Sequence, residues 1–178
     1  MCKYTTIFTI VDDFCKSYED WISHKLLISG KQRNRSGQLS LSESISIIIF
    51  YHFSPYKNFK LYYEYTVTGG TLFTNPPCYD RFIQIIPSLF LPVMIMLHYL
   101  SGNKTGLYYV DSTYFGVCKN IRISSHKTFK GLATRGHSSI DWFYGFKLHM
   151  IINERGEIIA IKITQGNVDD RKAFEEMI

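Results

Sequence analysis

The sequence lacks the short motifs that mark several common enzyme classes. It has no P-loop, no GxGxxG dinucleotide fingerprint, no GxSxG nucleophile elbow and no HExxH zinc motif. Its four cysteines, at positions 2, 15, 78 and 118, include no CxxC pair, and its histidines show no regular ligand spacing. These absences argue against a nucleotide-dependent enzyme, a serine hydrolase and a zinc ribbon.

The N-terminus also lacks the apolar core of a signal peptide, because Asp12 and Asp13 fall where it should lie. We therefore expect a cytoplasmic protein with free thiols and no membrane partner. The most apolar run, residues 82–100, has two prolines and barely reaches the length needed to span a bilayer. A buried core helix after Pro87 or Pro92 fits this run better than a membrane span.

Composition places the chain among globular proteins. Of its 178 residues, 46% are hydrophobic and 16% aromatic, and the formal net charge is +5. This length predicts one domain, or one domain with a helical extension, and it allows a sizeable core. The positive charge favours an anionic partner without identifying one.

Residues 1–100 read as a mainly helical region. Apolar side chains recur at helical spacing from Ile7 to Trp21. Ser40 and Glu43 form a capping-box pattern before a helix over residues 40–53. Residues 58–67 fit either a helix or a strand. Another helix is predicted to begin after the double proline at 76–77.

Residues 101–178 read differently, with strands predicted over 107–115, 142–153 and 158–164. The last two strands form an antiparallel hairpin with Gly156 at its turn. A helix follows, with Asn167 as the expected N-cap and Asp170 at the third helical position, where it favours the helix dipole. The expected fold is thus α+β or α/β, in which a mixed sheet of three strands and one helix forms an incomplete layer structure.

Asp111 is the one carboxylate within an apolar strand, and we expect it to be buried. It has two interpretations. Buried polar groups usually serve structure, so Asp111 could bond to Ser112, Thr113 or a backbone N–H. Alternatively, it could be a ligand of Mg²⁺, which prefers oxygen donors, in a phosphodiester-processing site. That site would need more carboxylates, and the candidates are Asp141, Glu154, Glu157, Asp169, Asp170, Glu175 and Glu176.

The segment between Asp111 and Asp141 contains no acidic residue. Its many glycine and serine residues predict a long loop. Basic side chains on such a loop suit contacts to phosphates, although a solvated surface loop has the same composition. The candidate DNA-binding residues are Lys119, Arg122, Lys127, Lys130 and Arg135.

These segments together resemble the catalytic domain of bacterial insertion-sequence transposases of the DDE class, closest to the insertion sequence nine-eight-two group. The resemblance rests on "DST" in the first strand, "HKTFKGLATRGHSS" in the loop, "WFYGFKLH" in the second strand and "GNVDDR" at the helix start. The upstream "FKLYYEY" and "YDRFIQIIPSLFLP" also resemble the N-terminal region of that group, so the resemblance covers nearly the whole chain.

The resemblance implies a helical DNA-binding region over 1–100 and an RNase H-like catalytic domain over 101–178. It further implies a nucleoid-associated enzyme that cleaves and transfers the terminal inverted repeats of an element with Mg²⁺ or Mn²⁺, with a homo-oligomer as a further expectation. By resemblance, Asp111 is the first catalytic carboxylate and a metal ligand. Asp169 and Asp170 match the helix-start motif and not the catalytic pair.

The chain departs from this family because it ends at Ile178, before the second catalytic Asp and the Glu. We therefore expect a truncated or frameshifted transposase that is inactive alone. The alternatives are a catalytically inactive fragment that still binds DNA, and a remnant with no function.

Overall fold

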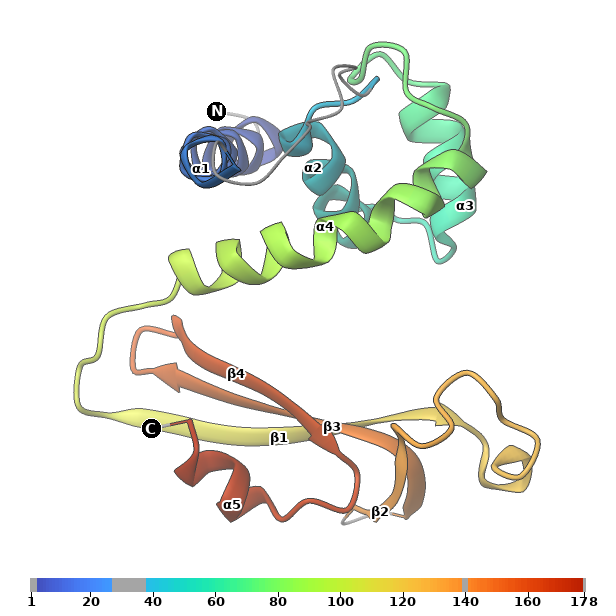
Figure 1. Ribbon diagram of the computed structural model, residues 1–178, viewed down its shortest axis with the longest axis vertical. Helices are drawn as coiled ribbons and strands as arrows, with labels where there is room; N and C mark the ends of the chain where they lie inside the picture. Colours follow the sequence, from blue (N-terminus) through green and yellow to red (C-terminus); the bar gives the residue numbers. More distant parts are fainter. Residues whose placement is uncertain (1–2, 27–37, 139–140, 178) are drawn as a thin grey trace. The chain divides into compact units, whose positions relative to one another are not determined.

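The computed structural model describes residues 3–26, 38–138 and 141–177 (Figure 1). The chain divides into two compact units, Met1–Leu97 and His98–Ile178. The first contains helices and the second contains a β-sheet, as the change of hydrophobic period near residue 100 predicts.

The helical unit contains four α-helices and one π-helical segment within the described residues. The capping box predicted at the start of α2 (Leu41–His52) is confirmed: the Ser40 hydroxyl accepts the N–H of Glu43, whose carboxylate accepts the N–H of Ser40. Residues 58–67, which fit either a helix or a strand in the sequence, are helical. A short α-helix there is followed directly by the π-helical segment. The elements are α1 (Lys3–Leu26), α2 (Leu41–His52), α3 (Phe59–Tyr62), the π-helical η1 (Tyr63–Thr68) and α4 (Tyr79–Tyr99).

Two clusters of buried side chains hold this unit together. Helix α1 packs Val11, Phe14 and Tyr18 against Ile45 of α2, whereas Trp21 at the end of its apolar stripe is half exposed. The second cluster is mostly aromatic. It contains Ile47, Phe50, Tyr62, Tyr63, Val67, Phe73 and Phe82.

Helix α4 begins after the double proline as predicted, but it does not begin or end at its internal prolines. It runs continuously through Pro87 and Pro92. Within the described ranges it is the one helix whose length and composition would allow it to cross a membrane, which is weak evidence because core helices can pass the same test. Phe82 and Met96 are buried, whereas Phe90, Leu91 and Met94 are exposed, so the prediction of a buried core helix is correct for only part of α4.

The second unit is built on a four-stranded sheet with β3 at its centre. Strand β3 (Trp142–Asn153) pairs antiparallel with β1 (Tyr108–Cys118), with β4 (Ile158–Gln165) and with a short strand β2 (Thr134–His137). The prediction of a mixed three-stranded sheet was therefore wrong. Strand β2 forms within the expected loop, where Gly136 lies so close to the Gly166 carbonyl that a side chain would clash.

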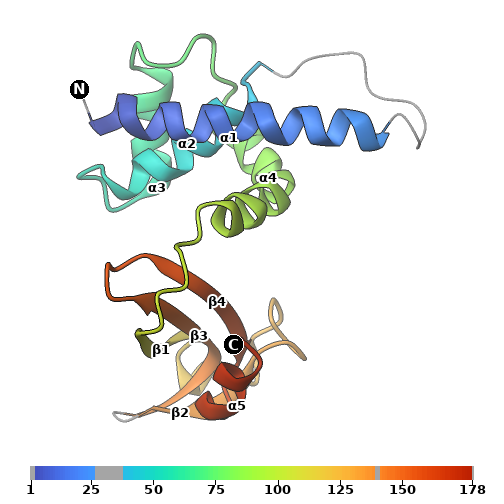
Figure 2. The same cartoon turned by 90° about the vertical axis from the view of Figure 1, so that its left-hand side faces the viewer.

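A single short helix packs against one face of this sheet. The short helix α5 (Asp170–Glu175) lies against the sheet in both views (Figure 1 and Figure 2) and contacts β3. This covered face contains His149, Ile151 and Asn153, all buried. The unit is thus α+β, consistent with part of an RNase H-like core.

The start of α5 differs from the prediction. Asp169, not Asn167, is the N-cap, and its carboxylate accepts the N–H of Arg171 at 2.8 Å. Asn167 instead bonds the Thr134 hydroxyl at 2.9 Å and so ties the loop to β2. Asp170 is consequently the first helical residue and not the third, although it still lies in the first turn, where a negative charge is favourable.

Candidate active-site face and nucleic-acid interface

Asp111 lies in the middle of β1, directly opposite Met150 of β3. The expectation that it is buried was wrong: its side chain is exposed, as is most of β1. The strand is apolar, but it is an edge strand and Asp111 lies on the sheet face away from α5. The carboxylate accepts the backbone N–H of Ser112 at 2.8 Å, which leaves oxygen lone pairs available to solvent or a ligand.

The other candidate carboxylates do not gather around Asp111. Glu154 and Glu176 bond Thr105 and Lys162, and Glu157 bonds Asn153 at 2.6 Å. Asp141 accepts the N–H of Trp142 at the start of β3. Within the described ranges, no group of three or more His, Cys, Asp or Glu side chains could hold a metal ion. Asp111 therefore offers a single carboxylate.

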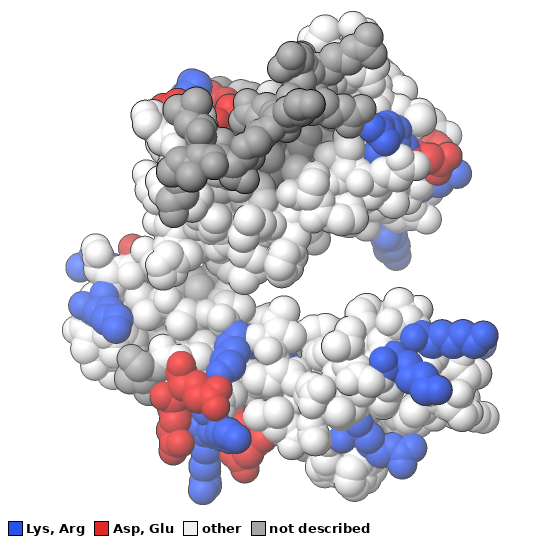
Figure 3. All heavy atoms as spheres, viewed as in Figure 1, with Lys and Arg blue, Asp and Glu red and all other residues white. Residues whose placement is uncertain are grey.

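The candidate DNA-binding residues follow the end of β1 in the chain, and the last of them, Arg135, lies on β2. Lys119, Arg122, Lys127, Lys130 and Arg135 are all exposed. A short 3₁₀ helix, Asn120–Arg122, and a series of turns shape this segment into more than an open loop. In the space-filling view, Lys and Arg at this end of the sheet unit have no acidic neighbour on the visible face (Figure 3).

This segment also forms a concave surface. A cavity of about 620 Å³ is lined by three of the candidate DNA-binding residues, Lys119, Arg122 and Lys127. His126 also lines it. Lysine and arginine side chains around a solvent-filled hollow, with serine and threonine hydroxyls between them, suit an anionic group such as a phosphate. Lys130 and Arg135 do not line it.

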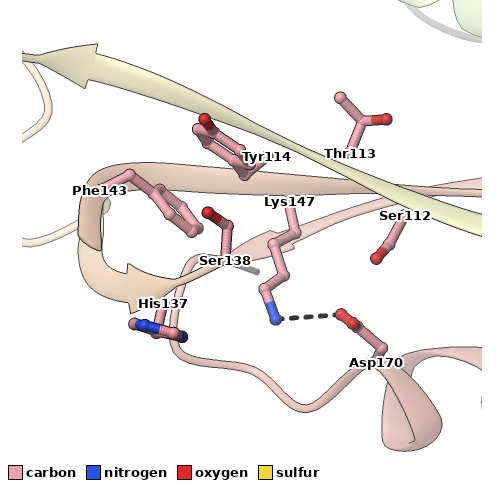
Figure 4. A pocket seen from close by; sticks show the side chains of 8 residues that line it. All are labelled: Ser112, Thr113, Tyr114, His137, Ser138, Phe143, Lys147 and Asp170. Carbon is pink, nitrogen blue, oxygen red and sulfur yellow. Dashed lines mark hydrogen bonds and ion pairs between the residues drawn. The ribbon is translucent and has the colours of Figure 1, made fainter. Parts of the chain in front are cut away.

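A second cavity, of about 370 Å³, lies where α5 meets β1 and β3 (Figure 4). Lys147 of β3 reaches across it, and its Nζ atom lies 3.0 Å from both the Asp170 carboxylate and the Val168 carbonyl. The Lys147 side chain is only 14% exposed. Ser112 and the stacked rings of Tyr114 and Phe143 complete the nearby wall.

Behind Lys147 lies His149, fully buried two residues along β3. Its Nε2 atom lies 2.8 Å from the Thr164 hydroxyl, and its ring packs edge-on against Phe174 of α5. Its Nδ1 atom has no hydrogen-bond partner and lies 3.8 Å from the Asp170 carboxylate. Despite the opposing effect of Asp170, burial lowers the pKa of this imidazole, which favours the neutral form of the ring.

This cluster of Lys147, His149 and Asp170 was not predicted as a unit. The signal was present, because two polar residues separated by one position in an apolar strand share a face of the sheet. The spacing of Lys147 and His149 therefore indicates that one face of β3 needs a polar partner from another element. The partner Asp170, however, is 23 residues away in sequence, and it was considered as a helix-start residue and a possible metal ligand but not as a partner of Lys147.

The sheet unit, with Asp111 and the basic segment, matches a known protein family. Residues 101–178 match the family described as "Transposase DDE domain". The match begins just before β1, includes Asp111 and the basic segment, and extends through α5. It supports a DDE transposase for the sheet unit. No curated protein and no solved structure matches the chain.

Proposed function

We propose that the chain is part of a DNA transposase of an insertion sequence, resembling the insertion sequence nine-eight-two group. The observation that carries this proposal is the family match over the whole sheet unit, which brings Asp111 and the basic segment into one transposase domain. The reaction class is metal-dependent cleavage and transfer of DNA strands at the ends of the element. Such a protein works in the cytoplasm on the nucleoid, and the helical unit is its additional DNA-binding region.

Asp111 is the proposed catalytic residue and metal ligand. An exposed carboxylate on a rigid strand suits Mg²⁺ or Mn²⁺, which keep several waters and accept oxygen ligands. The surrounding residues fit only one ligand of such a site, because the other described carboxylates are directed elsewhere. Two metal ions need several bridging carboxylates. We therefore expect no strand cleavage from this polypeptide alone.

The basic segment is the proposed DNA contact. Lys119, Arg122 and Lys127 line its concave surface, and Lys130 and Arg135 extend the positive charge beyond it. Contacts of this kind bind phosphates and carry little sequence information. Recognition of terminal inverted repeats would require base contacts from other residues, for which the helical unit is the proposed source.

A binding-only fragment is the second candidate function. It is favoured because the sheet unit has the basic segment, which is enough for DNA binding, but has only Asp111 as a carboxylate for metal chemistry. A chain of this kind would compete with complete transposase for DNA. A remnant without function differs from both in having no DNA affinity.

A plasmid-nicking assay separates these functions. The chain is incubated with supercoiled plasmid and either Mg²⁺ or Mn²⁺, alongside Asp111→Asn. We expect DNA binding without nicking by either protein. Nicking that disappears in Asp111→Asn would establish an active enzyme and contradict the incomplete metal site. The absence of both binding and nicking would contradict the transposase proposal itself.

A further inference from the structure

The basic segment (residues 119–135) also contains aromatic side chains, and they lie beside its cations. His126 lines the concave surface together with Lys127 and two further cations. The ring of Phe129 stacks on the ring of His126, with 5.9 Å between the centroids and 14° between the planes. The cation-lined surface therefore continues directly into a pair of stacked rings.

This pair of rings is held in place by the sheet. The ring of Phe129 stands nearly perpendicular to that of Phe146 on β3, with 5.6 Å between the centroids, and His126 contacts Tyr144 of β3 in a similar geometry. The main-chain carbonyl of Phe129 also accepts the N–H of Ala133 at 2.9 Å. Because the rings are already ordered, a ligand that stacks on them loses little affinity to the ordering of side chains.

A hydrogen bond also orients the imidazole. The N–H of Phe129 donates to Nε2 of His126 at 3.3 Å. A histidine that accepts at Nε2 carries its hydrogen on Nδ1, and this N–H can donate to an anion. His126 thus combines a stacked ring with a donor at the cation-lined surface.

The charges around Phe129 indicate what binds there. Its side chain is 38% exposed, and it lies between the exposed Lys127 and Lys130 in a segment that has no acidic residue from Asp111 to Asp141. A protein element packed over this ring would have to remove both ammonium groups from water, which is costly without acidic partners. A polynucleotide instead brings phosphates to the lysines and a flat base to the ring.

The ring favours one form of DNA over another. In a duplex the bases are paired and stacked on one another, so that a protein ring meets the face of a base only where that base is unpaired. Proteins that bind single strands combine cations that follow the backbone with aromatic rings on which the bases stack. The basic segment has both features.

We propose that Phe129 stacks on an unpaired base of a DNA strand whose phosphates contact the surrounding lysine and arginine side chains. Single-stranded DNA then gains a contact that a duplex cannot make. The proposal rests on the proposed function, since it takes DNA as the ligand of the basic segment. Stacking of this kind tolerates any base, so it adds affinity for unpaired DNA and not for a particular sequence.

Fluorescence anisotropy at one salt concentration tests the proposal with two labelled probes. One is an oligothymidine, which forms no base pairs with itself, and the other is a duplex of the same length. Phe129→Leu keeps an apolar contact to Phe146 but has no flat face. We expect it to weaken binding of the oligothymidine at least about fivefold and binding of the duplex less than about twofold.

Two further variants are the controls. Phe129→Tyr keeps the ring and should bind the oligothymidine as the native chain does. Tyr109→Leu removes a ring that is 57% exposed on β1, outside the basic segment, and should leave binding of both probes unchanged. Circular dichroism must show the same secondary structure for all of these chains.

Three outcomes would overturn the stacking contact while leaving DNA binding in place. These are equal losses on both probes in Phe129→Leu, undiminished binding of the oligothymidine by Phe129→Leu, and a loss in Phe129→Tyr as large as that in Phe129→Leu. Failure of the native chain to bind either probe would instead contradict the proposed DNA contact, and the stacking contact with it. The two proposals are therefore distinguished by whether the native chain binds the duplex.

Discussion

Lys147 Nζ lies 3.0 Å from the Asp170 carboxylate and so links the centre of the sheet to the first residue of α5. The helix is only six residues long and could not hold its position through its own hydrogen bonds. The ion pair, with the Val168 carbonyl as a second acceptor, fixes this helix over the buried face.

Replacing Lys147 with Met should destabilise the chain. The apolar stem of the side chain remains, but Asp170 and the Val168 carbonyl lose their shared donor. Because the Asp170 side chain is 43% exposed, solvent compensates in part, and we expect a loss of about 1–2 kcal/mol in the free energy of unfolding. Urea denaturation followed by circular dichroism measures this loss.

Lys119→Met is the matched control, because it removes the same charge from an exposed position. Equal stability of Lys147→Met and Lys119→Met would contradict the structural role of the ion pair. A double-mutant cycle with Asp170→Asn isolates the pairwise contribution.

Buried His149 should make stability depend on pH. Its pKa in the folded state is lowered from 6.5, first because burial disfavours the charged ring. The unfolded chain therefore binds more protons than the folded chain below about pH 6.5, and stability must fall as the pH decreases through that value. Above it, both states are neutral and the contribution of His149 is complete.

Unfolding free energies measured from about pH 7.5 to about pH 5 test this effect. His149→Gln, which can still bond the Thr164 hydroxyl, should flatten the dependence. The carboxylates whose pKa values are lowered, at Asp12, Glu154 and Glu176, change protonation below about pH 4.5 and do not interfere. An identical pH dependence in His149→Gln would show that other groups cause it.

The cysteines should differ in reactivity. Cys15 is 3% exposed in the core of the helical unit, where burial raises the pKa of its thiol to about 11. Cys78 is exposed. Because the thiolate is the reactive species, iodoacetamide at neutral pH should modify Cys78 in the folded chain and Cys15 only after denaturation. Peptide mass spectrometry measures both, and rapid modification of native Cys15 would contradict the packing of α1 against α2.

Local signals explain which parts of the fold could be predicted. Helix α2 has a capping box at Ser40 and Glu43, and β3 was predicted with its observed limits because it begins with an aromatic run and ends just before the Gly156 turn. The short strand β2 has little apolar pattern and forms because β3 extends beyond β4 and needs a partner there. The strand conformation of β2 depends on pairing with β3, and the β2 sequence alone does not predict it.

Burial and pairing could not be predicted in the same way. Asp111 was expected to be buried because its strand is apolar, but the exposure of a strand is decided by the elements that cover it. Similarly, Asp170 was interpreted as a helix-start residue and a possible metal ligand, although its partner is Lys147 from a different element. The carboxylate and the basic segment were recognisable from residue type, whereas their environment required the structure.

The most direct test of the central proposal, that this chain is part of a DNA transposase, is DNA affinity measured by fluorescence anisotropy over a series of salt concentrations. The probe is a labelled short duplex of random sequence. The chain is compared with Lys119→Ala/Arg122→Ala/Lys127→Ala and with Lys104→Ala/Arg155→Ala/Lys172→Ala, which removes the same charge from exposed positions of the sheet unit outside the basic segment.

We predict strongly salt-dependent binding by the native chain. The first triple variant should reduce the slope of log affinity against log salt by about 2.7, at about 0.9 for each lost phosphate contact, while the control triple variant retains most of the native slope. Absent binding, or equal losses in the two triple variants, would contradict the assignment of the basic segment as the DNA contact of this domain.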